Sequence, residues 1–417
     1  MQAITLSALF LSLLALNAGV RIWLARRQIH HVAQHRNDVP QAFAQRIGLA
    51  SHRRAADYTI ARTRLRIIKT VFDTAVLMAL TFGGVLGAIY LGVDQWFGNV
   101  LWRDVALIGS VVLLLGAISL PFTIYRQFKL EGRFGFNRMT PQLFLTDSVK
   151  GLVLSIALGL PLLTLILWLM GSAGPTWWVW AWASWAAFNF MVMLIFPTWI
   201  APLFNKFSPL SDQGLKARIE ALAKRCDFSI QGLFVMDGSK RSAHGNAYFT
   251  GVGKSRRIVF FDTLLAKLTP AEIEAVLAHE LGHFKHKHIT RRLITTLAGS
   301  FLIFALLGWL TGQAWFYEGL GVTPLAGSNN GMALLLFVLV MPVFTFMLTP
   351  LTSWLSRRDE FEADRFAAAQ SQAKDLVSAL VKLFNDNAAT LTPDPVHSAF
   401  YDSHPPAAIR IKALASA

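Results

Sequence analysis

Long apolar runs separated by basic segments are the main pattern along this chain. A helix that crosses the hydrocarbon core of a bilayer requires about 20 mostly apolar residues, and seven stretches have this length. They lie near residues 4–24, 70–94, 104–125, 149–171, 175–200, 293–312 and 331–355. The pattern predicts an all-α integral membrane protein with seven transmembrane helices. Prolines inside or beside several stretches predict kinked helices, which membrane proteins tolerate.

The first apolar stretch, Ile4 to Leu24, is followed by its positive charges at Arg26 and Arg27. A secretory signal peptide carries its basic residues in front of the apolar segment. We therefore expect a retained membrane anchor. The alternative is a cleaved signal peptide with its cleavage site near residues 15–18.

The composition agrees with a membrane protein, because 54% of the 417 residues are hydrophobic and only 15% are charged. A net charge of +15 would suggest nucleic-acid binding in a soluble protein. Here the basic residues alternate with apolar stretches and form no single basic face, so we expect no nucleic-acid partner.

The basic residues also predict the orientation in the membrane. They concentrate in residues 25–69, 126–148 and 201–292 and in the tail from Ser356, whereas none occurs between Gln313 and Ser356. By the positive-inside rule, the amino terminus lies outside and the carboxyl terminus in the cytoplasm. An odd number of spans agrees with this assignment.

These segments divide the chain into four parts. Residues 1–204 carry spans one to five, 205–292 form a polar cytoplasmic segment, 293–355 carry spans six and seven, and 356–417 form a cytoplasmic tail. Within the second part we expect a helix at Gln213 to Lys224 and a small β element from residues 230–236, 247–250 and 257–262. Thr269 and Pro270 then predict the N-cap and first position of another helix.

That helix carries His279-Glu280-Leu281-Gly282-His283, an H-E-x-x-H motif. Histidines four residues apart lie on one helical face, where both can bind the same zinc ion. Glu280 is then placed to act as general base on a zinc-bound water. Cys226 is the only cysteine, so further ligands must be histidines or carboxylates.

A third ligand is expected from Glu360 or Asp364, which lie four residues apart on a predicted helix, Asp359 to Ala369, that continues from the last span. One carboxylate can bind the metal while the other orients a ligand histidine. Spacing alone leaves the assignment open. We expect His286 and His288 to be solvated or near lipid headgroups, and Glu362 to be a surface partner of a nearby arginine.

The chain resembles the type I CAAX prenyl proteases, which are gluzincin-type membrane zinc endopeptidases that process prenylated proteins and the a-factor pheromone. The likeness covers nearly the whole sequence. Besides the H-E-x-x-H motif it rests on Gly135-Phe136-Asn137, Asn205-Lys206-Phe207, Asn246-Ala247-Tyr248, residues 258–264 and 356–367, and Ser403-His404-Pro405-Pro406 followed by Arg410. The short loops on the outer side and the final Ala-Leu-Ala-Ser-Ala fit a compact bacterial member in the inner membrane.

This resemblance implies that Glu360 is the third ligand of one zinc ion and that Asp364 supports a ligand histidine from behind. It implies that Asn246 and Ala247 bind the substrate backbone as an edge strand, the alternative being a surface turn at residues 244–246. It also implies that His404 stabilises the oxyanion and that the seven helices enclose a chamber. Arg410 would either pair with Asp364 or stabilise developing charge.

We therefore expect a metalloendopeptidase that acts, as a monomer, on a peptide with a prenylated or hydrophobic carboxyl end. A membrane quality-control protease without prenyl specificity is the alternative. A transporter or receptor with a regulatory zinc site is disfavoured because the spans carry few ionisable residues. A structural zinc module that catalyses nothing would require a fourth protein ligand on the metal.

Overall fold

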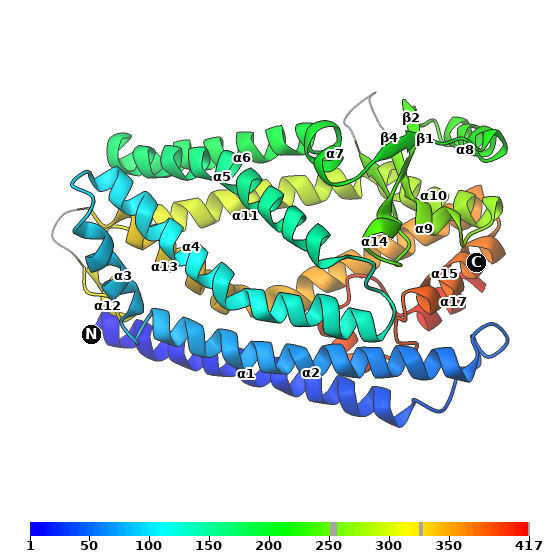
Figure 1. Cartoon of the computed structure of the whole chain (residues 1–417), viewed down its shortest axis with the longest axis horizontal. Coiled ribbons are helices and arrows are strands. Elements are labelled where there is room, and N and C mark those ends of the chain that lie inside the picture. The colour runs from blue at the N-terminus through cyan, green and yellow to red at the C-terminus, as the bar shows by residue number, and fades with distance from the viewer. Residues whose placement is uncertain (251–256, 325–327, 416–417) are drawn as a thin grey trace.

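The computed structural model describes residues 1–250, 257–324 and 328–415. Helices dominate it, and a small sheet lies at one end (Figure 1). Among the described residues, six helical segments are long and apolar enough to cross a membrane, and a bent pair of helices, at 51° to each other, makes a seventh when taken as one span. The seven predicted spans and the helical fold class are thus confirmed. In chain order the segments are Gln2–Gln34, Leu49–Leu80 with Val85–Asp94, Val100–Glu131, Pro141–Ser172, Gly174–Phe204, His288–Leu310 and Asn330–Gln370.

The first three spans are built from five pieces: α1 (Gln2–Gln34), the bent pair α2 (Leu49–Leu80) and α3 (Val85–Asp94), and α4 (Val100–Ile124) with a π-helical turn, Tyr125–Glu131. The remaining spans are α5 (Pro141–Ser172), α6 (Trp177–Ile195), α11 (His288–Leu310) and α13 (Asn330–Thr345), which continues into α14 (Thr349–Gln370). The short helix α7 (Ala201–Phe204) ends the fifth span, and α12 (Ala314–Glu318) lies between α11 and α13.

Prolines disturb the long helices where the sequence predicts irregularity. Pro121 precedes the π-helical turn at the end of α4, and Pro197 lies within a second π-helical turn, Phe196–Ile200. Proline removes a backbone donor from the helical ladder, so the neighbouring carbonyls adopt other spacings. The spans therefore bend without leaving the helical state.

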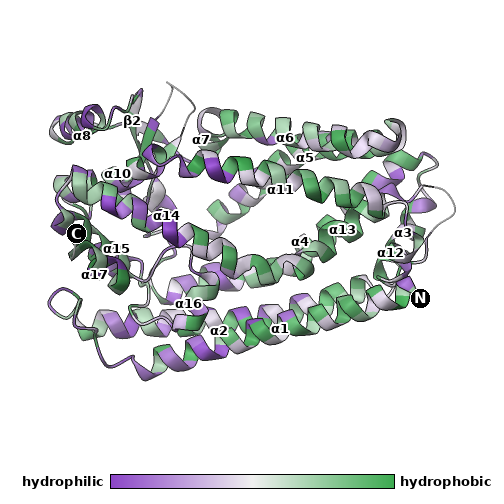
Figure 2. Cartoon of the chain, turned by 180° about the vertical axis from the view of Figure 1, so that it is seen from behind, coloured by the Kyte–Doolittle hydropathy of each residue, from purple (hydrophilic) through white to green (hydrophobic). Residues whose placement is uncertain are grey.

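Hydrophobic residues dominate α4, α5, α6, α11 and α13, whereas hydrophilic residues gather at the end of the molecule near α8 (Gln213–Arg225) and α10 (Pro270–Lys285) (Figure 2). The sheet and the C-terminus lie at this hydrophilic end, and the N-terminus lies at the opposite end (Figure 1). In a chain with an odd number of spans, the two termini lie on opposite sides of the membrane.

The sheet has four strands in the order β1-β2-β4-β3. They are β1 (Phe207–Pro209), β2 (Gly232–Met236), β3 (Ala247–Thr250) and β4 (Arg257–Phe261). Strand β4 ends one residue earlier than predicted, because the Asp262 carboxylate accepts hydrogen bonds from the backbone N–H groups of Ser239 and Thr263 and begins α9 (Asp262–Leu265). The three residues of β1 are too few for a pattern, and the sequence did not predict them.

The tail folds back over the motif helix. After α14 come α15 (Ala373–Asp386), α16 (Pro395–Tyr401) and α17 (Ala407–Ala415). One buried apolar cluster joins α8, the sheet, α10, α14 and α15, with Ile258, Phe260, Ile273 and Leu277 near its centre. Because each of these elements buries an apolar face there, the polar side chains of α10 and α14 are held in a fixed relation.

Candidate metal centre

The motif helix α10 begins where the sequence predicts. The Thr269 side chain accepts a hydrogen bond from the Glu272 backbone N–H, and the Glu272 carboxylate accepts one from the Thr269 N–H, which completes a capping box. Pro270 occupies the first helical position. With its start fixed, α10 buries Ile273, Leu277 and Leu281 in the core and turns both motif histidines toward α14.

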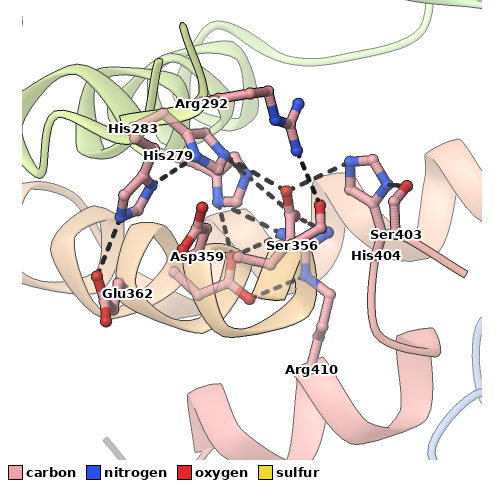
Figure 3. Close-up of polar contacts among 12 residues, drawn as sticks. His279, His283, Arg292, Ser356, Asp359, Glu362, Ser403, His404 and Arg410 are labelled. Atoms are coloured by element: carbon pink, nitrogen blue, oxygen red, sulfur yellow. Dashed lines mark hydrogen bonds and ion pairs between the residues drawn. The ribbon is translucent and has the colours of Figure 1, made fainter. Parts of the chain in front are cut away.

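Three donor groups meet between α10 and α14 (Figure 3). The Nε2 atoms of His279 and His283 lie 3.3 Å apart. The Glu360 carboxylate lies 3.5 Å from His279 Nε2 and 3.4 Å from His283 Nε2. Gly282 permits this approach, because a Cβ atom there would lie 2.9 Å from the Ala363 Cα atom.

The chemistry of this donor set fits a zinc ion. Zinc in catalytic sites takes three nitrogen or carboxylate oxygen ligands and leaves one position open. One Glu360 oxygen, Oε2, is buried and makes no well-formed hydrogen bond, although His279 Nε2 and the Arg410 guanidinium each lie 3.5 Å away. A cation bound closer to this oxygen would stabilise it. Two imidazole nitrogens and one carboxylate directed at the same point can bind one shared cation once the imidazoles are neutral.

A second carboxylate holds His279 from behind. Asp364 Oδ1 lies 2.8 Å from His279 Nδ1, on the side of the ring opposite the donor group. In the metal-free site, burial lowers the pKa of His279, but hydrogen bonds with Asp364 and Glu360 raise it more strongly, to about 9. Asp364 therefore fixes the ring with Nε2 directed at Glu360.

Arg410 of α17 pairs with Asp364 and is 5% exposed. Its Nη2 and Nε atoms donate hydrogen bonds of 2.6 and 2.8 Å to the two Asp364 oxygens. Burial lowers the pKa of the guanidinium, but Asp364 and, more weakly, Glu360 and Glu280 raise it. Of the two expected roles, pairing with Asp364 is present in this structure, and Arg410 is also 3.5 Å from Glu360.

The other residues expected at the site come from three elements. Glu280 is half-buried on α10 beside the histidines. His404 Nε2 lies 3.4 Å from Glu360, and its side chain is 64% exposed, so the ring faces the open side of the donor group. Asn246 and Ala247 lie at the start of β3, which occupies one edge of the sheet and pairs with β4 alone among the described strands.

One residue lies elsewhere than the sequence indicated, and another has a second contact. His288 is not solvated: it is 5% exposed and lies beside His283. Glu362 does contact an arginine, Arg358, at 3.4 Å, but it is also 3.0 Å from His288. His286 is exposed, as expected. The contact of His288 depends on the turn between α10 and α11, which spacing along one helix cannot describe.

Both halves of the chain match known protein families. Residues 28–206 match the family described as CAAX prenyl protease N-terminal, five membrane helices. Residues 209–417, which contain all three donor residues, match peptidase family M48. The chain belongs to peptidase family M48. It is a membrane zinc metalloprotease of the CAAX prenyl protease type, which confirms the family and the enzyme class predicted from the sequence.

Curated relatives of this M48 protease come from distant eukaryotes. CAAX prenyl protease 1 of Saccharomyces cerevisiae is 34% identical over 94% of this chain and 91% of its own length. The Arabidopsis thaliana homologue is 33% identical over 90% of both chains. In the crystal structure of S. mikatae Ste24p, 99% of each chain superimposes with a TM-score of 0.89 and 30% identity. The whole fold of the M48 protease is shared.

Proposed function

We propose that this protease binds one Zn²⁺ through His279, His283 and Glu360 and hydrolyses a peptide bond near the carboxyl end of a prenylated or hydrophobic peptide. The proposal rests on the convergence of these donors around Glu360, one of whose buried oxygens accepts no hydrogen bond. The names of the relatives, CAAX prenyl protease 1, support the substrate class. Three protein ligands leave one coordination position for water, as catalysis requires.

When bound, zinc polarises the scissile carbonyl and lowers the pKa of a water molecule to about 7. Glu280 accepts the proton of that water and delivers it to the leaving amine. Asp364 keeps His279 in the tautomer that presents Nε2. His404, on the open side of the donor group, donates a hydrogen bond to the oxyanion, and Arg410 adds positive charge from behind Asp364.

Strand β3 is proposed to bind the substrate backbone. The Phe261 N–H donates to the Asn246 carbonyl, and Ala247 is opposite Phe260 in the antiparallel register. Hydrogen-bonded and non-bonded pairs alternate along antiparallel strands, so the Ala247 backbone groups face the free edge. The ring of Phe249 in the same strand is 5.3 Å from that of Phe284, the residue after His283. An extended peptide added to this edge would run beside the motif helix.

The proposed topology has the amino terminus outside and the site in the cytoplasm, in a bacterial inner membrane. It is supported by the basic segments, which coincide with the hydrophilic end of the molecule (Figure 2). The enclosed chamber and the monomeric state remain predictions. Cysteine labelling from either side of the membrane, with single cysteines placed in residues 96–98 or 212–214, tests the orientation.

The decisive experiment compares two substitutions in purified protein. Glu280→Gln is expected to keep one zinc per chain but to lose at least a hundredfold in turnover, because the proton acceptor is removed. Glu360→Gln is expected to lose zinc. Retained cleavage by zinc-loaded Glu280→Gln, or an unchanged zinc content in Glu360→Gln, would contradict the assignment.

The same preparation tests the substrate. A farnesylated CAAX peptide and its unprenylated twin are compared with a chelator control for each. Faster cleavage of the prenylated peptide supports a prenyl protease. Equal cleavage rates would show that the prenyl group is not recognised and would favour a quality-control protease that accepts hydrophobic peptides in general.

A further inference from the structure

A row of three side chains leads from the protein surface to the zinc site. His283 Nδ1 lies 2.9 Å from His288 Nδ1. On the other side of the His288 ring, Nε2 lies 3.0 Å from the Glu362 carboxylate. His288 is buried, whereas the Glu362 side chain is 21% exposed. The close-up shows Glu362 and Arg410 on different sides of the two motif histidines (Figure 3).

The protons on the ring nitrogens decide which residue donates each hydrogen bond in this row. A ligand histidine must present an unprotonated nitrogen to the metal, and His283 Nε2 is the atom that faces Glu360. A neutral imidazole carries its single proton on the other nitrogen, so His283 Nδ1 donates to His288 Nδ1. His288 must then carry its own proton on Nε2, which donates to Glu362. Every ring nitrogen thus has a partner.

The local backbone is bent to allow this contact. Lys287, the residue between α10 and α11, has φ 56° and ψ 29° in the left-handed region. A residue other than glycine rarely adopts this conformation, so the surrounding structure must maintain it. The turn at Lys287 places His288, at the start of α11, next to His283.

The two motif histidines are therefore held by different means. His279 is fixed by Asp364, which is itself paired with Arg410. His283 has no carboxylate at Nδ1; it has His288 there. Its side chain is 19% exposed, against 8% for His279. His283 therefore depends more on a single neighbour for its ring orientation.

We propose that His288, supported by Glu362, is a positioning residue that holds the zinc ligand His283 in its metal-binding tautomer and orientation. This inference rests on the proposed zinc site. Second contacts of this kind change metal affinity or activity by about 10- to 100-fold. His288 does not touch the substrate in this proposal and acts only through His283.

A second metal ion is the competing explanation, because ligand atoms of His288, Asp359 and Glu362 also lie within 4.8 Å of one another. Two contacts disfavour it. Asp359 forms an ion pair with Arg291, and the His288 nitrogen that faces Glu362 is the one that carries the proton in the row. Metal stoichiometry separates the two explanations.

The test measures zinc release from the full-length protein to a chromophoric chelator, with metal content and the visible spectrum of the cobalt-substituted protein. His288→Phe retains the ring but removes both nitrogens, and we expect zinc release 10- to 100-fold faster and an altered cobalt spectrum. His288→Asn, whose amide oxygen can accept from His283 Nδ1, should restore part of the loss. His286→Gln, a neighbouring exposed histidine, is the matched control and should match the unmodified protein.

Glu362→Gln gives a second, milder variant, with a smaller acceleration of zinc release in the same direction. Wild-type release rates in both His288→Phe and Glu362→Gln would overturn the positioning role while leaving the zinc protease intact. Two zinc ions per wild-type chain that fall to one in His288→Phe would overturn it in favour of a second metal site. Failure of the proposed function is distinct, since the wild-type protein would then bind no zinc or Glu280→Gln would still cleave.

Discussion

A Cβ atom on Gly282 would lie 2.9 Å from the Cα atom of Ala363. This close approach of α10 to α14 places the two motif histidines of α10 near the Glu360 carboxylate of α14. The glycine is thus needed for its small size, in a helix where its backbone freedom is a cost.

Gly282→Ala is therefore expected to push α14 away from α10. Overpacking of this kind costs about 1–3 kcal/mol, and the separation of donors should lower zinc affinity as well. Thermal unfolding in detergent and zinc titration measure both effects. Gly299→Ala in α11 is the control, since a Cβ there meets nothing within 4 Å. Equal melting temperatures and zinc affinities for the two variants would contradict the packing argument.

Zinc binding should depend on pH through His279. Its pKa of about 9 in the metal-free site means that the ring is protonated at neutral pH and that zinc must displace this proton. Apparent zinc affinity should rise by up to about tenfold per pH unit from pH 7 and level off above about 9. Competition with a chelator of known affinity measures it.

Asp364→Asn supplies the control for this pH dependence, because it removes the carboxylate that raises the pKa, and the plateau should begin at lower pH. In the metal-free protein, the stability of the fold changes with pH in the opposite direction to the zinc affinity. A raised pKa stabilises the fold below the unfolded value of about 6.5, and this stabilisation is lost as the pH rises through about 9. A zinc affinity that stays constant from pH 7 to 9 would refute the protonated histidine.

Arg410→Met should destabilise the fold by about 3–5 kcal/mol, because it removes the guanidinium from the buried Asp364 carboxylate and leaves His279 as the remaining partner. If the arginine acts mainly by pairing, the double variant Arg410→Met with Asp364→Asn should regain part of the lost melting temperature. Turnover at saturating zinc distinguishes the other role, with Asp364→Asn alone as the reference. A double variant with restored stability but turnover a hundredfold below that of Asp364→Asn would assign Arg410 to charge stabilisation.

Ala247→Pro tests the substrate strand. The Ala247 N–H faces away from β4 and donates to the Asn246 side-chain oxygen, a bond that an added substrate strand would replace. Proline there removes the donor without breaking the pairing with β4. We expect KM to rise about tenfold or more with unchanged zinc content. Ala247→Ser keeps the N–H and should behave like the unmodified protein. A proline variant with normal KM would exclude pairing at this residue.

The sequence predicted those features that depend on local patterns. The seven spans follow from length and hydrophobicity, and the start of α10 follows from Thr269 and Pro270. The membership of Glu360 and Asp364 in one site was also predicted. Their separate roles were not evident from spacing, since residues four apart share a helical face. In the structure, Glu360 meets the Nε2 side of His279 and Asp364 meets its Nδ1 side.

Features that depend on the turn between helices were not predictable. His288 belongs to a different helix from His283, and their contact requires the left-handed conformation of Lys287. No periodicity describes such a junction, because helical spacing ends where the helix ends. The contact of Glu362 with His288 was not predicted for the same reason, since the two residues lie 74 positions apart in the chain.

The continuous path of α14 out of the last span also affects how the enzyme is made. Glu360 is synthesised 77 residues after His283 (360 − 283), and two membrane helices must be inserted in between. At about 5–20 residues per second, several seconds separate the two events. On the proposed zinc site, the nascent chain lacks its third ligand during that interval, and proteolytic activity begins only after both helices have been inserted.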